Sequence, residues 1–266
     1  MTGAPSGLWA AGDVYEPYVG RWSRLVAREF VRWLAVPADA EWVDVGCGTG
    51  ALTQTIVDHA TPRAVKGLDQ SAGFVAHATA HVRNARVSFA VADAQALPLE
   101  RRSADAAVSG LVLNFVPEPL RMVTEMARVT RPGGVVALYL WDYAGRMELM
   151  RQFWDAAVAL DPAAREKDEG SRFPICRPEP LTRLFTQAGL RDIETRAIDV
   201  PTRFRDFDDY WTPFLGGQAP APAYAMSLDD VRRGALREHL RSTLPTARDG
   251  SIALTARAWA IRAAAV

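Results

Sequence analysis

A short apolar strand that runs straight into a glycine-rich turn is the feature that most constrains this chain. It occupies residues 43–50 and reads VDVGCGTG. Glycine lacks a Cβ atom, so it tolerates positive φ and lets a ligand lie directly against the backbone. The amphipathic segment that follows predicts a helix whose first N–H groups and positive dipole end face the turn. Together these features predict a binding site for a nucleotide-like ligand at the carboxyl edge of a parallel sheet.

Strand and helix patterns alternate along the first half of the chain. Strands are expected at about residues 42–45, 64–68, 87–91, 104–108 and 135–140, with helical patterns between them and a turn at 131–134. This alternation indicates βαβ units, and therefore a parallel sheet with helices on both faces. Two more strands are expected at about 191–200 and 252–260, and an aromatic-rich segment lies between them.

Composition excludes several classes of protein. The 266 residues carry 31 basic and 31 acidic side chains, so no bulk charge draws the chain to nucleic acid or to an anionic membrane. Cys47 and Cys176 are too few for a zinc site or a disulfide framework, and we expect no metal. With neither an export leader nor an apolar run of about 20 residues, the chain is expected to be cytoplasmic.

The glycine-rich turn alone does not identify its nucleotide. Residues 46–51 satisfy the dinucleotide fingerprint, and Asp69 stands about where that fingerprint places its ribose-binding acid. An NAD(P)-dependent oxidoreductase therefore stays open on this evidence. A P-loop does not, because no Gly-Lys-Ser/Thr sequence follows the turn.

Four further blocks follow in a fixed order: 67–71 (GLDQS), 92–98 (ADAQALP), 104–109 (ADAAVS) and 128–134 (RVTRPGG). With the glycine turn they resemble the class I S-adenosylmethionine-dependent methyltransferases, in particular the ubiquinone-biosynthesis-type small-molecule enzymes. The resemblance spans roughly residues 15–142. It implies an α/β fold: a Rossmann-like, doubly wound, seven-stranded and mostly parallel sheet with an antiparallel last strand. The aromatic-rich segment is expected to form an inserted cap.

The resemblance also implies how S-adenosyl-L-methionine is bound. Asp69 would accept hydrogen bonds from both ribose hydroxyls, and a charged acceptor strengthens such bonds. Asp93 and the Ala94 N–H would bind the adenine. The remaining contacts are implied as follows: Gly46, Cys47 and Gly48 beside the methionine part, Gln70 along the adenine or ribose, the Ser109 carbonyl at the ammonium, Tyr18 as lid packing and Arg21 at the carboxylate.

The acceptor side is predicted from residues that follow strand ends and from the aromatic segment. Expected to line it are Asn114, Phe115, Trp141, Tyr210 and Trp211. Asp142 and Tyr143, just past the fifth strand, are candidates to deprotonate or position the acceptor. Two alternatives stay open, since Asp142 could equally cap the next helix and the aromatic side chains could simply pack their segment onto the sheet.

The sequence therefore predicts a methyltransferase that acts on a small, apolar or aromatic molecule by direct displacement. The alternatives are the NAD(P)-dependent oxidoreductase and a methyltransferase-like module that binds cofactor without catalysis, the latter favoured by the absence of a clear general base. We expect residues 1–266 to form a single domain. Its cofactor-binding core would be 15–142, and 143–176 and 201–248 would be cap segments on the acceptor side.

Overall fold

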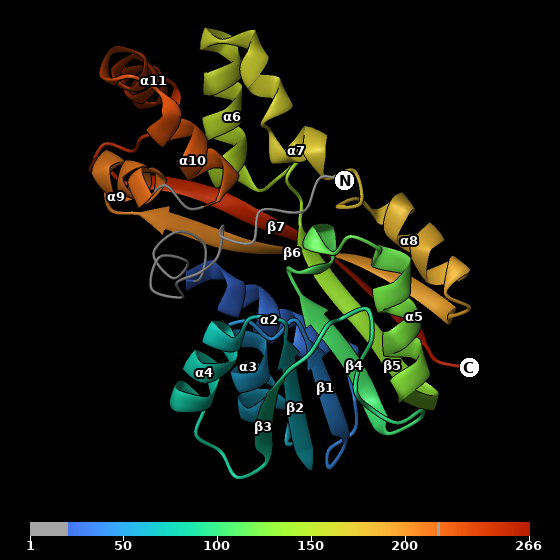
Figure 1. The fold of residues 1–266 in the computed structure, drawn as a ribbon. Helices are drawn as coiled ribbons and strands as arrows, with labels where there is room; N and C mark the ends of the chain where they lie inside the picture. The colour runs from blue at the N-terminus through green and yellow to red at the C-terminus, as the bar shows by residue number, and fades with distance from the viewer. Residues whose placement is uncertain (1–20, 217–218) are drawn as a thin grey trace.

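A seven-stranded sheet in the order β3-β2-β1-β4-β5-β7-β6 forms the centre of the protein (Figure 1). The structure is a computed structural model that describes residues 21–216 and 219–266. Its strands are β1 (Glu41–Val45), β2 (Ala64–Asp69), β3 (Val87–Val91), β4 (Ala104–Gly110), β5 (Thr130–Trp141), β6 (Arg191–Phe204) and β7 (Ile252–Ala264). The first five pair in parallel, and β7 lies antiparallel between β5 and β6. The expected fold class is confirmed.

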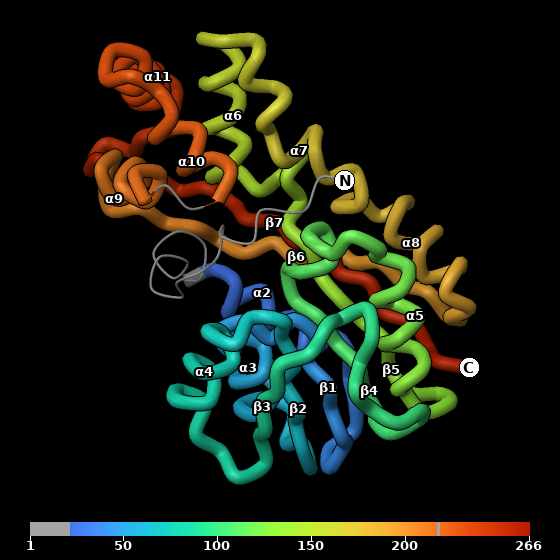
Figure 2. The backbone as a smooth tube through the Cα atoms, viewed as in Figure 1, coloured from blue at the N-terminus to red at the C-terminus, as the bar shows by residue number. Residues whose placement is uncertain are grey.

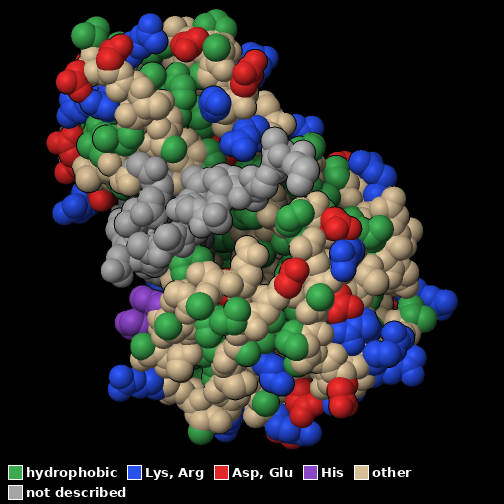
Figure 3. Space-filling model, viewed as in Figure 1, with side chains coloured by type: hydrophobic (Ala, Val, Ile, Leu, Met, Phe, Trp, Pro, Cys, Tyr) green, Lys and Arg blue, Asp and Glu red, His purple; other side chains and the backbone are tan. Residues whose placement is uncertain are grey.

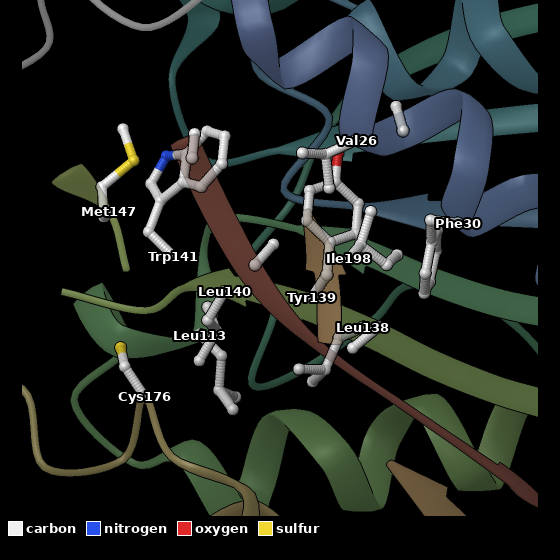
Figure 4. Close-up of a cluster of buried hydrophobic side chains, with 14 of the residues drawn as sticks. Val26, Phe30, Leu113, Leu138, Tyr139, Leu140, Trp141, Met147, Cys176 and Ile198 are labelled. Carbon is white, nitrogen blue, oxygen red and sulfur yellow. The ribbon is translucent and has the colours of Figure 1, made fainter. Parts of the chain in front are cut away.

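Helices cover both faces of this sheet. α2 (Arg21–Leu34) packs with α3 (Ala51–Ala60), and α5 (Pro119–Val129) packs with α8 (Pro178–Gln187) on the opposite face. α4 (Ala72–His81) flanks β2 and β3. Because both faces are covered, β5 is buried continuously from Val136 to Trp141, which accounts for its uninterrupted apolar sequence. Figure 4 shows side chains of α2, β5 and β6 meeting in this core.

The predicted turn at residues 131–134 is instead a bulge within β5. Ala104 pairs with Thr130 but Ala106 pairs with Val135, so β5 has four residues, 131–134, where β4 has only Asp105. Gly133 takes a φ of 78° there, and its N–H donates to the Ala265 carbonyl. Proline and glycine favour bulges as well as turns, so their presence did not distinguish the two.

Two segments build a cap above the sheet (Figure 2). The first holds α6 (Glu148–Leu160), η3 (Pro162–Glu166) and α7 (Glu169–Arg172). The second holds α9 (Phe207–Trp211), η4 (Thr212–Gly216), α10 (Pro220–Ser227) and α11 (Asp230–Thr243). α6 contacts both α10 and α11, so the segments form one helical layer. Among the described residues, no helix is both long enough and apolar enough to cross a membrane.

The strands that carry this cap are longer than predicted. β6 and β7 stay paired as far as Phe204 and Ile252, beyond the last pair of β5 with β7. Beyond the end of β5, β6 and β7 continue as a two-stranded ribbon that leads to the cap. Residues 205–251 join the end of β6 to the start of β7 at the far end of this ribbon (Figure 1).

Candidate active site

A cavity of about 480 Å³ lies at the carboxyl ends of the parallel strands. Its wall combines the glycine turn after β1 with the residues that follow β2, β3 and β4. The space-filling view shows a hollow between the sheet and the cap, with basic and acidic side chains interspersed over the visible face (Figure 3). The cavity lies at the position where open α/β sheets bind their ligands.

The glycine turn needs glycine for two different reasons. Gly46 has φ 75°, and a Cβ atom there would lie 2.6 Å from the Val112 side chain. Gly48 has φ 53°, but a Cβ atom there would meet nothing within 4 Å, because this position borders the cavity. Gly46 and Cys47 both donate their backbone N–H to the Leu68 carbonyl, at 2.7 and 3.0 Å. These bonds fix the turn against the end of β2.

Asp44 ties the turn to the helix that follows it. The side chain is fully buried in β1, and its Oδ2 accepts a 2.6 Å hydrogen bond from the Thr53 hydroxyl of α3. Burial raises the pKa of Asp44 to about 7. The residue supports the loop from beneath and does not line the cavity.

Asp69 is the last residue of β2 and is held by two backbone donors. Its Oδ2 accepts from the Gly48 N–H at 3.0 Å, and its Oδ1 accepts from the Ser71 N–H at 2.9 Å. Burial raises the pKa of Asp69, while these two bonds lower it. Each carboxylate oxygen keeps a further lone pair, so the group can still accept hydrogen bonds from a ligand.

Asp93, after β3, is exposed and lines the same cavity. Its Oδ1 accepts from the Gln95 backbone N–H at 2.8 Å and from the Gln95 side chain at 3.2 Å. The Gln95 side-chain oxygen in turn accepts from the Glu118 N–H at 3.1 Å. This chain of bonds links the loop after β3 to the start of α5.

Most residues predicted for the cofactor share this one cavity. Its wall includes Gly46, Cys47, Gly48, Asp69, Gln70, Asp93 and Ala94. Burial raises the pKa of the Cys47 thiol, which argues against a nucleophilic role. Ser109 is buried and does not contribute to the wall. Tyr18 lies outside the described residues, as does the side chain of Arg21.

The residues predicted for the acceptor are more scattered. Phe115 lines the cavity and packs edge-on against Phe173 at 5.4 Å between ring centroids. Asn114 does not line it, and both polar atoms of its amide are buried, with no hydrogen-bond partner in the part of the chain that the structure describes. Tyr210 and Trp211 are 0% and 4% exposed inside the cap. The Tyr210 hydroxyl donates to the Leu149 carbonyl of α6, so these rings pack the cap and do not reach the cavity wall.

The predicted catalytic pair also lies behind the cavity wall. Asp142 is 6% exposed, and its Oδ2 accepts from the Arg146 N–H at 2.9 Å, so it closes the turn before α6. Tyr143 is equally buried, with its ring 5.7 Å from that of Phe173. Trp141 is 2% exposed in the core.

Several wall residues were not predicted as site residues, among them four with hydroxyl groups: Ser23 of α2, Thr49, Ser71 and Tyr139 of β5. Ser23 and Tyr139 lie outside the sequence blocks around the predicted site. The strand expected at 135–140 contains Tyr139, but the pattern of apolar residues held no signal that Ser23 or Tyr139 reaches the cavity. Only the pairing of Tyr139 with Gly110, 29 positions earlier, brings its hydroxyl to the wall.

Comparisons with known proteins agree with this geometry. Residues 43–138 match a family model described as a methyltransferase domain. The chain is 30% identical over 175 residues to demethylmenaquinone methyltransferase of Bacillus licheniformis, which covers 60% of this chain and 74% of that protein. It is 36% identical over 92 residues to malonyl-[acyl-carrier protein] O-methyltransferase of Hahella chejuensis, covering 35% of this chain.

A third relative is the chloroplastic 2-methyl-6-phytyl-1,4-hydroquinone methyltransferase of Spinacia oleracea, 38% identical over 156 residues and 59% of this chain. The match spans 33% of the Hahella protein and 41% of the Spinacia protein, less than half of either.

Solved structures show the same fold at low sequence identity. Phosphoethanolamine N-methyltransferase 2 of Haemonchus contortus, solved with phosphomonomethylethanolamine and S-adenosylhomocysteine, superposes with a TM-score of 0.58 at 16% identity. That match covers 95% of this chain and 56% of that one. The YcgJ protein of Bacillus subtilis superposes with a TM-score of 0.59 at 16% identity, covering 90% and 97%. Strand order, glycine turn and sequence relatives agree: the chain belongs to the class I methyltransferases, whose cofactor is S-adenosylmethionine.

Proposed function

We propose that this protein transfers the methyl group of S-adenosylmethionine to a small, apolar or aromatic acceptor. The observation that carries the proposal is the Asp69 carboxylate, oriented on the cavity wall by the Gly48 and Ser71 N–H groups. A fixed carboxylate at the end of β2 suits a ribose, because it presents two acceptor oxygens to two neighbouring hydroxyls.

The cavity residues fit the other parts of this cofactor. Gly48 leaves open space where a side chain would stand, which allows a ligand to lie against the backbone. Asp93 and Ala94 border the cavity after β3, where an acceptor and an N–H donor suit the edge of an adenine. Gln70 borders it after β2, beside the adenine or ribose. The bound cofactor supplies a methyl group already activated by a positive sulfonium.

The acceptor is proposed to lie where the cavity wall is apolar. Leu111, Val112, Phe115, Val116 and Pro117 form that part of the wall. Apolar walls with few polar groups bind small apolar molecules. Asn114 stays a proposed acceptor contact from its place after β4 alone, because its amide is buried behind this wall, with no hydrogen-bond partner among the described residues.

Positioning is proposed to supply most of the rate enhancement. Of the described cavity-lining residues, the ionisable ones are Cys47, Asp69, Asp93 and Tyr139. Both aspartates are assigned here to the cofactor, and the burial that raises the pKa of the Cys47 thiol disfavours its thiolate. The protein would therefore align the acceptor and exclude water. This arrangement suits acceptors that ionise readily or carry a lone pair.

We also propose a cytoplasmic location, because both cysteines are free thiols.

Family membership favours methyl transfer over the NAD(P)-dependent oxidoreductase. Titration calorimetry with S-adenosylhomocysteine and with NAD tests this directly: we expect the first to bind and the second to give no heat. Tight binding of NAD without a response to S-adenosylhomocysteine would contradict the proposal. A panel of phenols, amines and hydroquinones, assayed for S-adenosylhomocysteine release, then separates an enzyme from a binding module.

A further inference from the structure

Tyr139 places a hydroxyl group at the cavity wall although it belongs to β5, the strand beside the cavity. Its side chain is 3% exposed and lines the cavity together with Gly110 and Ser23. In the ladder of β4 and β5, Tyr139 pairs with Gly110. A Cβ atom at Gly110 would lie 2.6 Å from the Tyr139 hydroxyl oxygen, so the phenol leans across the end of β4.

The ring has little freedom in this position. Phe30 of α2 packs against it at 4.8 Å between centroids, with the two planes tilted by 59°. Figure 4 shows Val26, Phe30 and Ile198 around the ring, and the hydroxyl end directed toward α2. Gly110 and this packing together hold the hydroxyl above β4 and beside the cavity.

The strand order assigns a position along the cofactor to each wall residue. From β3 through β2 and β1 to β4, the strand ends present Asp93, Asp69, the glycine turn and Gly110 in that order. A ligand with its adenine at Asp93 and its ribose at Asp69 must extend across β1 toward β4. β4 lies two strand spacings from β2, about 10 Å. The chain from the ribose to the amino-acid end of the cofactor is of comparable length.

We infer that Tyr139 is a positioning residue for the amino-acid end of S-adenosylmethionine, with its hydroxyl set by Gly110. This inference rests on the proposed function. A phenol hydroxyl can donate a hydrogen bond to a carboxylate or accept a hydrogen bond from an ammonium group, and the amino-acid end carries both groups. A glycine is then required at position 110, since any side chain there would displace the phenol.

The test compares two ligands that differ only at the end in question. S-adenosylhomocysteine carries the amino-acid part, whereas 5′-methylthioadenosine retains the adenosine and the sulfur without it. By titration calorimetry, Tyr139→Phe is expected to weaken S-adenosylhomocysteine roughly ten- to a hundredfold, the range for a hydrogen bond to a charged group. Binding of 5′-methylthioadenosine should change less than about twofold, because its contacts are elsewhere. Gly110→Ala should show the same selectivity.

Tyr224→Phe is the matched control, since that ring packs against Trp154 in the cap and does not line the cavity. It should bind both ligands as the unmodified chain does. Equal weakening of both ligands by Tyr139→Phe would indicate a structural role and overturn the inference, as would binding of both at unmodified strength. If the unmodified chain bound neither ligand, the proposed function would fail first and this inference with it.

Discussion

At the residue scale, the aspartates that follow β2 and β3 could be predicted but Tyr139 could not. Strands that alternate with helices end at one edge, so acids placed after them converge whatever the details of packing. Tyr139 reaches the cavity only because its partner in the ladder is a glycine. That fact depends on strand register, which a single sequence does not specify. The sequence could not show whether Tyr210 and Trp211 line the cavity, which they do not in the structure, because an aromatic-rich segment has the same composition whether it packs a cap or lines a pocket.

Asp69→Ala is expected to weaken S-adenosylhomocysteine binding by about 1.5–3 kcal/mol, the range for hydrogen bonds to a charged group. The loss should include a contribution from the turn, because the same carboxylate orients the Gly48 N–H. Titration calorimetry measures it, with Asp58→Ala on the outer side of α3 as the control. An unchanged affinity would mean that the ribose is held elsewhere.

At the element scale, α7 carries a buried acid that has no place in the proposed reaction. Glu169 is 2% exposed and accepts a hydrogen bond from the Trp154 indole, and burial raises its pKa to about 7. The folded state therefore binds this proton more tightly than the unfolded chain does. The stabilisation from Glu169 is complete below about pH 4.5 and is lost as the pH rises through about 7.

Glu169→Gln should remove that pH dependence, because the amide stays neutral and its oxygen can still accept from Trp154. We expect the variant to gain in free energy of unfolding relative to the unmodified chain as the pH rises from 5 to 8, by up to about 3 kcal/mol. Urea unfolding at several pH values measures the difference. Glu166→Gln, at an exposed position of η3, should show no such trend. If the free energy of unfolding of Glu169→Gln changed with pH in parallel with that of the unmodified chain, the raised pKa assigned to Glu169 would be contradicted.

At the scale of the whole molecule, the alternation of strands and helices and the two cap segments could be predicted from patterns that span many residues, whereas the strand order comes from the structure. The segments at 143–176 and 201–248 were expected on one side of the molecule, and their helices do contact each other. The ends of β6 and β7 could not be predicted, because they depend on pairing: residues 201–204 pair with β7, and residues 261–264 pair with β5 and with β6.

Ligand binding should stabilise the whole fold, since the cavity joins elements from six separate parts of the chain. At a ligand concentration about 100 times its Kd, a ligand that binds only the folded state adds about 2.7 kcal/mol. For a chain of this size that corresponds to a rise in Tm of roughly 5–10 °C. Differential scanning fluorimetry with S-adenosylhomocysteine should detect it, and an equal rise with NAD would contradict the cofactor assignment.

The paired extension of β6 and β7 gives this architecture an evolutionary freedom. Residues 205–251 enter and leave through the end of one hairpin, so they could be lengthened, shortened or exchanged without shifting the strands whose ends hold the nucleotide. None of the described residues of this appendage lines the cavity, so such changes would leave the proposed cofactor and acceptor contacts in place.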